Sequence, residues 1–454
     1  MPSLANVAMH FFLQLAVILA AYRLLWPLFK RLGQVQVVAI MVAGFALGPS
    51  LLGWLAPDVQ SWIFPQKVVV DGVSVTHPSL TALYVVGQFG LVLYMFVVGM
   101  SFDTGIFRNH VRHAAVTSLA GIIAPMVLGG AVGWFFVDRL FADDIAGWQA
   151  ALFMAAAVSI TAFPMLAWIV YDTGLLKTRL GTVALACAAA DDAVAWILLA
   201  AVVASTKSTA LGAALALVGG LVYLTVMLTA GRRLLGRLGS WSDRQSGDKR
   251  TLPVGALVTT MLVLLAGAWF TDYVGIYAVF GAFIAGVAMP RGVLADTLRE
   301  RIEPLTAYVL VPAFFVYSGL NTDLNLMLGG SMLAMLALIL VVSFLGKGVA
   351  VGIAGRLQGM NWNEAGSLGA LMNARGLMEL ILLNIGLTAG IVTPELYTLL
   401  AVMTIVTTFA ASPVHKFFDR RGQRAAARTA ASEVPQAADS ERGEPVAASA
   451  AEVR

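Results

Sequence analysis

The chain has 454 residues, of which 59% are hydrophobic and only 12% are charged, and its formal net charge is +4. Soluble domains carry about 25% charged residues, so the composition excludes a soluble globular protein and indicates a polytopic membrane protein. The small positive charge does not indicate nucleic-acid binding, because the basic residues follow membrane topology. One cysteine excludes an internal disulfide framework.

Windows of about 20 apolar residues predict roughly thirteen transmembrane helices. The first is followed, not preceded, by Lys30 and Arg31, which indicates a retained span rather than a cleaved signal peptide. In chain order the predicted spans cover residues 5–29, 35–53, 80–101, 115–137, 148–171, 181–205, 210–235, 252–272, 273–290, 304–321, 330–355, 364–388 and 394–415.

Basic residues alternate between the loops that join these spans. One set of loops contains only Lys67, Arg139 and Lys207. The positive-inside rule places the other, basic-rich set in the cytoplasm, so we expect the N-terminus outside and the C-terminus inside. The basic-rich loops contain Lys30, Arg31, Arg108, Arg112, Lys177, Arg179, Arg232, Arg233, Arg237, Arg244, Lys249, Arg250, Arg291, Arg299, Arg301 and Arg356.

From about Lys416 the composition changes to Ala, Arg, Glu, Pro and Ser, with almost no large apolar residue. Segments of this kind cannot bury enough apolar surface to fold. We therefore expect a transmembrane domain over residues 1–415 and a disordered cytoplasmic tail over residues 416–454, without an appended nucleotide-binding domain.

Two adjacent carboxylates, Asp191 and Asp192, interrupt the apolar run "ALACAAADDAVAWILLA". An ionised group at bilayer depth is costly unless it is paired or faces a water-filled cavity. Lys347, in "SFLGKGVAVG", is the candidate partner. Neighbouring helical residues point about 100° apart, so one aspartate can pair with Lys347 while the other faces a cavity. A purely structural ion pair is the alternative, but two acids against one lysine leave a surplus carboxylate.

A second buried pair is predicted in "NARGLMEL", where Arg375 and Glu379 are four residues apart on one helix face. Structural and functional roles are both open for this pair. Because arginine stays charged, we favour a fixed anchor over a titrating group.

Two spans carry helix-breaking sequences. The fifth contains Ser159, Thr161 and Pro164 in "AVSITAFPML", and the twelfth contains Asn373 and Arg375 in "LMNARGLM". Proline removes a backbone hydrogen bond, and the freed carbonyls can coordinate a cation if they line a cavity. A merely structural kink is the alternative for either segment.

The two broken spans occupy equivalent positions. "GMSFD" (residues 99–103) ends the third span and "GLNTD" (residues 319–323) ends the tenth, and each is followed by an apolar span, a broken span and one more helix. The two series run in opposite directions, which predicts an inverted-topology repeat with a midplane site. The predicted fold class is an all-α polytopic membrane protein with two crossing discontinuous helices.

These motifs resemble the monovalent cation:proton antiporter-2 family, especially bacterial relatives of the plant cation/proton exchangers and the potassium-efflux antiporters. The resemblance covers about residues 5–415 and implies a sodium/proton antiporter fold, alternating access, a homodimer and a bacterial-type inner membrane. It is carried by "GFALGPSLLG", "SITAFPMLAWI", "ACAAADDAVAWILLA", "VPAFFVYSGLNTDL" and "LGALMNARGLMELILLNIGL".

The resemblance also implies roles. Asp192 carries the cation or proton, Asp191 pairs with Lys347, and Thr161 and Asn373 lie at the unwound segments. Two acids are typical of members that are often electrogenic. Trp168 stands where many members have arginine, and the nucleotide-binding domain of the potassium-efflux branch is missing, which argues against that kind of ligand gating.

A dehydrated Na⁺ or K⁺ needs oxygen ligands, for which the Asp192 carboxylate, the Thr161 hydroxyl and freed carbonyls are candidates. We expect proton and cation to compete for this charge. A cation channel, a ligand-gated potassium-efflux pathway and a non-transporting sensor are the alternatives. We expect neither a cofactor nor an enzyme, because no His/Cys metal constellation or nucleophile–base pair appears.

Overall fold

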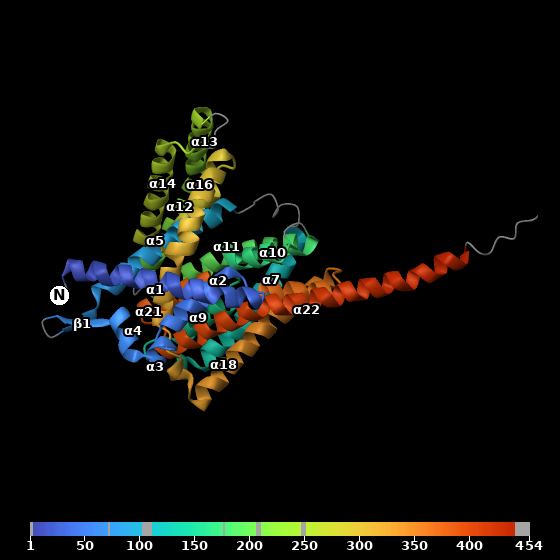
Figure 1. Cartoon of the computed structure of the whole chain (residues 1–454), viewed down its shortest axis with the longest axis horizontal. Coiled ribbons are helices and arrows are strands. Elements are labelled where there is room, and N and C mark those ends of the chain that lie inside the picture. Colours follow the sequence, from blue (N-terminus) through green and yellow to red (C-terminus); the bar gives the residue numbers. More distant parts are fainter. Residues whose placement is uncertain are drawn as a thin grey trace, which may run out of the picture.

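The computed structural model describes residues 3–70, 73–101, 111–175, 178–205, 210–246 and 251–440 (Figure 1). Among these residues, eleven helices are long and apolar enough to cross a membrane. The broken element α9–α10 and the shorter apolar helix α15 correspond to the two remaining predicted spans. The expected helical membrane protein is therefore confirmed.

The first part of the chain consists of two membrane-spanning helices, a connecting segment of short helices and strands, and a third membrane-spanning helix. Its elements are α1 (Leu4–Arg31), α2 (Gln36–Leu47), α3 (Leu52–Leu55), α4 (Pro57–Ile63), β1 (Lys67–Val70), β2 (Val73–Thr76) and α5 (Pro78–Ser101). The antiparallel hairpin β1–β2 was not predicted. It forms where valines and threonine, which favour strands, follow the short helices.

Helix α1 lies at the periphery of the bundle. It begins at the cap Ser3, whose side chain accepts the Asn6 N–H, and it buries only Gln14, Ile18 and Phe29. Its other apolar side chains are exposed or half-buried, as expected for a helix that faces lipid. Helices α2 and α5 lie deeper, and both pack against α17 (Val311–Leu320).

The middle of the chain contains the first broken helix and a group of helices that Figure 1 shows projecting together beside α5. The projecting group comprises α12, α13, α14 and α16. The elements are α7 (Val111–Phe135), α8 (Val137–Leu140), α9 (Gly147–Ser159), α10 (Phe163–Asp172), α11 (Arg179–Ser205), α12 (Ala210–Val226), the π-turn η2 (Met227–Gly231), α13 (Arg232–Ser246), α14 (Val254–Tyr273), α15 (Ala278–Ala288), α16 (Val293–Leu305) and the π-turn η3 (Thr306–Leu310).

The last part contains α17, the second broken helix and the long helix α22 (Figure 1). After α17 its elements are the 3-10 turn η4 (Leu324–Met327), α18 (Gly330–Ser343), the π-turn η5 (Phe344–Val349), α19 (Ala350–Leu357), α20 (Trp362–Met372), α21 (Leu377–Thr388) and α22 (Pro394–Ser440). Helix α20 packs between α19 and α22, as α9 packs against α7.

Helix α22 differs from the expected tail. The composition predicted disorder from about residue 416, but the helix continues without a break to Ser440. The segment "RRGQRAAARTAA" contains alanine, arginine and glutamine, which have high intrinsic helix propensity. The composition showed the lack of core-forming residues, but the prediction from it did not take the helix propensity of this segment into account.

Some residues used above lie outside the described part of the chain. They are Phe102 and Asp103 of "GMSFD", the loop residues Arg108, Lys177, Lys207, Lys249 and Arg250, and residues 441–454 of the predicted tail.

Candidate ion-binding site

The two broken helices meet at their breaks. Helix α9 ends at Ser159 and α10 begins at Phe163, while α20 ends at Met372 and α21 begins at Leu377. The backbone N–H of Ala162 donates to the carbonyl of Ala374 over 3.0 Å. The predicted interruptions are therefore real and they contact each other, 212 residues apart in sequence.

Local chemistry explains both breaks. Pro164 is the second residue of α10, where a missing N–H is tolerated, so the interruption falls just before it. Gly376 caps α21 with φ of 158°, a conformation that side chains disfavour. A Cβ atom at Gly376 would also lie 2.9 Å from Met165 Cγ of α10. Glycine thus permits the close approach of the two broken helices.

The helix ends at the crossing are matched by buried charges of the opposite sign. The last carbonyls of a helix carry partial negative charge and the first amides carry partial positive charge. At the end of α9, Lys347 donates to the Ser159 carbonyl, and Arg375 donates to the carbonyls of Ala157 (2.8 Å) and Val158. The arrangement therefore places both cations at a C-terminal helix end.

Asp191 is held by three side-chain donors. Its Oδ1 accepts from Ser118 Oγ at 2.6 Å, and its Oδ2 accepts from Thr161 Oγ1 at 2.8 Å and from Lys347 Nζ at 2.9 Å. The predicted pairing with Lys347 is observed, and both side chains are inaccessible. Lys347 lies in the π-turn η5. Such turns are frequent at functional sites.

Asp192 has a different environment, although it is also fully buried. Its Oδ1 accepts from the Phe163 N–H at the beginning of α10, over 3.4 Å. Its Oδ2 has no hydrogen-bond partner among the described residues. Asn373 Oδ1, at the second break, is likewise without a partner in the described chain. Buried acceptors are nearly always satisfied. Arg375 Nε and both carboxylate oxygens of Glu379 also lack a hydrogen-bond partner among the described residues, but these two side chains form an ion pair with each other, whereas Asp192 has no ion-pair partner there.

Arg375 and Glu379 form the second buried pair, with 3.6 Å between Nη1 and Oε2. The backbone of Arg375 is fixed as well, because its N–H donates to Thr408 Oγ1 and its carbonyl accepts from the same hydroxyl, over 2.9 and 2.8 Å. Arginine therefore connects α9, the second break and α22. These contacts agree with a fixed anchor.

Two contributors were missed by the sequence reading. Ser118 on α7 is 73 residues from Asp191, and a single serine in an apolar span gives no signal of its own. The Phe163 N–H is a backbone donor whose availability follows only from the break. Thr161 was expected beside Asp192, but its hydroxyl contacts Asp191 and lies 3.1 Å from the Met372 carbonyl. The side chains of Pro164 and Trp168 lie outside the described part.

The charges at the crossing do not balance. Asp191, Asp192 and Glu379 supply three carboxylates against the two cations Lys347 and Arg375, and all five side chains are at most 2% exposed. Asp191 and Glu379 have ion-pair partners, which leaves Asp192 as the surplus acid. A neutral site would require one further positive charge at Asp192.

Broken helices that cross at a buried, unbalanced charge cluster define a secondary-transporter type of membrane protein. The family of the chain is specified by its sequence. The family described as "Sodium/hydrogen exchanger, transmembrane" matches residues 15–418, and the chain belongs to it. The expected membership in a cation:proton antiporter family is confirmed.

Relatives and a solved structure agree with this assignment. The chain is 38% identical over 412 residues to the Na⁺/H⁺ antiporter NhaS4 of Synechocystis, covering 90% of this chain and 97% of that protein. It is 34% identical over 411 residues to cation/H⁺ antiporter 17 of Arabidopsis thaliana, covering 88% of this chain but only 47% of the plant protein. The fold matches the sodium proton antiporter MjNhaP1 of Methanocaldococcus jannaschii, with TM-score 0.61, 14% identity, and 92% and 96% of the chains covered.

Proposed function

We propose that this chain is a secondary active antiporter that exchanges a monovalent cation, Na⁺ or K⁺, for protons by alternating access, and that Asp192 binds both in turn. One observation carries the assignment. Asp192 is a fully buried carboxylate at the crossing of two broken helices, with one oxygen that no described group satisfies.

Asp191 is the less suitable carrier. Each of its oxygens already accepts a strong hydrogen bond, and Lys347 neutralises it. Withdrawing it from these donors would leave a buried unpaired ammonium, which is strongly unfavourable. Asp192 has only the 3.4 Å hydrogen bond from the Phe163 N–H, on Oδ1, so a cation or proton can bind at Oδ2 without breaking a strong interaction.

The mechanism follows from the charge balance. With Asp192 ionised and empty, the crossing holds a surplus negative charge, which is costly to carry across a low-dielectric barrier. Either a proton or a monovalent cation neutralises it. The loaded forms can therefore cross, the empty form cannot, and exchange is obligatory. The oxygens available to a cation are Asp192 Oδ2, Asn373 Oδ1 and the carbonyls freed at the breaks. Thr161 supplies a further hydroxyl oxygen nearby.

The remaining parts of the proposal concern the cell. The alternation of basic loops supports an inner-membrane protein with its N-terminus outside and its C-terminus in the cytoplasm. Resemblance to the two-acid antiporters supports a homodimer and electrogenic exchange. One proton exchanged for one cation at Asp192 moves no net charge, so electrogenic exchange requires a second proton, carried by another group. Response of the exchange rate to an imposed membrane voltage tests the electrogenic part.

The test of the carrier is Asp192→Asn, which keeps the shape of the side chain and removes its charge. Purified protein in liposomes containing a pH-sensitive dye is challenged in turn with gradients of Na⁺, K⁺, Li⁺ and Rb⁺. We expect wild type to couple at least one cation to proton movement and D192N to lose this coupling. Asp138→Asn removes an exposed carboxylate outside the site and serves as the matched control.

Full exchange by correctly folded D192N would refute the assignment of Asp192. The channel alternative predicts a different result, because a channel conducts the cation without saturable proton counterflow. Saturation of proton counterflow with rising cation concentration therefore separates antiport from conduction.

A further inference from the structure

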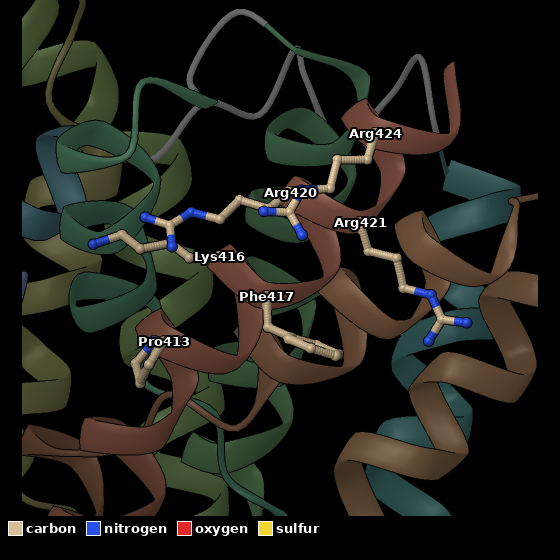
Figure 2. A pocket seen from close by; sticks show the side chains of 6 residues that line it. All are labelled: Pro413, Lys416, Phe417, Arg420, Arg421 and Arg424. Atoms are coloured by element: carbon tan, nitrogen blue, oxygen red, sulfur yellow. The ribbon is translucent and has the colours of Figure 1, made fainter. Parts of the chain in front are cut away.

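Helix α22 carries a basic pocket beyond its apolar part. Lys416, Arg420, Arg421 and Arg424 line it together with Pro413 and Phe417, and its volume is about 560 Å³. The spacing of three and four residues places all six on one face of the helix. Figure 2 shows Lys416, Arg420 and Arg424 in a row along α22, with Phe417 and Arg421 beside them. The lining has four cations and no acid.

These charges are not neutralised within the described part of the chain. Lys416 Nζ donates to the Gly33 carbonyl over 3.0 Å. This hydrogen bond fixes the position of the ammonium group but does not neutralise its charge. Arg420, Arg421 and Arg424 form no ion pair with any described side chain. The neighbouring acid, Asp419, accepts from Gln423 and is not part of the lining. Four like charges on one face repel one another and attract anions to this face.

Contacts of α22 place the pocket at the level of the membrane surface. Gly33 lies two residues after Arg31, which ends α1, and Gly422 packs against Asn363 at the start of α20. Beside Asn363, Trp362 is 64% exposed with the Arg356 guanidinium 5.7 Å over its ring. Exposed tryptophan and arginine at a helix end mark a membrane–water interface. This is the side that the basic loops assign to the cytoplasm.

The dimensions fit a lipid headgroup. Lys416 to Arg424 extends about 12 Å along the helix at about 1.5 Å per residue, whereas the headgroup layer of each leaflet is roughly 5–8 Å thick. The pocket therefore covers the headgroup layer and the adjoining water. Pro413 lies about one turn before Lys416, at the end of the pocket nearer the apolar part of α22, and the 60% exposed Phe417 lies between Lys416 and Arg420.

We infer that this pocket binds the phosphate headgroup of an anionic phospholipid of the cytoplasmic leaflet. Guanidinium groups bind phosphate oxygens bidentately, and the surface of an anionic leaflet attracts polybasic segments. Free phosphate shares the same chemistry, but the apolar side chains of Pro413 and Phe417 in the lining favour the lipid. The site is independent of the ion-binding crossing.

The test uses the purified full-length protein in detergent, stripped of lipid. Thermal unfolding is followed while phosphatidylglycerol, cardiolipin or phosphatidylcholine is added, and native mass spectrometry counts the lipids retained. We expect anionic lipids to raise Tm and phosphatidylcholine to leave it unchanged. In the triple variant R420Q/R421Q/R424Q we expect at least a tenfold higher lipid concentration for the half-maximal shift. The single variant R420Q, which removes one exposed side chain, should show about a threefold increase.

A matched control removes the same charge elsewhere. The variant R232Q/R233Q/R237Q neutralises three arginines on α13 and should keep the wild-type lipid response. If this control lost the lipid response as much as the pocket variant does, the site would be overturned, because the lipid response would then depend on the net charge of the protein. Inorganic phosphate is added in a separate arm. If phosphate alone stabilises the protein as much as lipid does, the lipid assignment is overturned. An unchanged lipid response in the folded triple or single pocket variants would overturn it as well.

Discussion

Asp191 and Lys347 form a closed ion pair between α11 and the π-turn η5, with 2.9 Å between Oδ2 and Nζ and no solvent access to either side chain. Lys347 also donates to the Ser159 carbonyl at the end of α9. One ammonium group thus connects α11, the helix that bears Asp191 and Asp192, to the break at the end of α9. The pair therefore holds the geometry in which Asp192 meets the Phe163 N–H.

Lys347→Ala should destabilise the protein strongly, because it leaves Asp191 buried without its counter-charge. Breaking one partner of a buried pair costs about 3–5 kcal/mol. Thermal unfolding in detergent measures the loss, and the exposed Lys30→Ala serves as the control for removing a lysine. Unchanged thermal stability together with unchanged charge movement per exchange would contradict the structural role of this pair.

The charged residues and the helix breaks of the site could be predicted from the sequence, because both depend on local sequence features. A carboxylate pair in an apolar run is conspicuous at bilayer depth, and Pro164 and Gly376 disfavour a regular helix wherever they occur. Equivalent placement of the two broken spans then indicated that they cross. The observed contact between Ala162 and Ala374 agrees with that prediction.

Features that depend on tertiary contact could not be predicted. Ser118 is an ordinary serine until the fold places it 2.6 Å from Asp191. The π-turn at Lys347 changes the hydrogen-bond register without changing hydropathy. Hydropathy likewise predicted where α22 leaves the membrane and could not show that the helix continues to Ser440.

Gly369→Ala should disturb the site indirectly. A Cβ atom at Gly369 of α20 would lie 2.2 Å from the Gly348 carbonyl, one residue after Lys347. The helix and the π-turn would have to separate, and overpacking of this kind costs about 1–3 kcal/mol. We expect a lower Tm and slower exchange. Gly330→Ala, where an added Cβ meets nothing within 4 Å, should leave both unchanged. Equal effects of the two substitutions would rule out the contact as the cause.

Arg375→Lys tests the anchor. The guanidinium bonds the carbonyls of Ala157 and Val158 and pairs with Glu379, whereas an ammonium has no planar fork with which to make all three contacts. Loss of one charge-assisted hydrogen bond predicts destabilisation of about 1.5–3 kcal/mol, seen as a lower thermal midpoint. At the surface pair of Arg299 and Glu303 the same substitution should cost less than about 1 kcal/mol. A wild-type midpoint in R375K would mean that positive charge alone suffices.

Competition at one carboxylate predicts a specific pH dependence of transport. If the proton and the cation both bind Asp192, acidification raises the cation concentration needed for half-maximal exchange and leaves the maximal rate attainable at saturation. The increase approaches about tenfold per pH unit once the carboxylate is mostly protonated, as for a single competing proton. Initial rates in liposomes, at several cation concentrations for each pH, measure both quantities.

Asp192→Glu, which keeps a carboxylate, should retain the competitive pattern with a shifted midpoint, and Asp138→Asn should match wild type. A half-saturating concentration that is independent of pH, with only the maximal rate changing, would place the proton and the cation on separate groups.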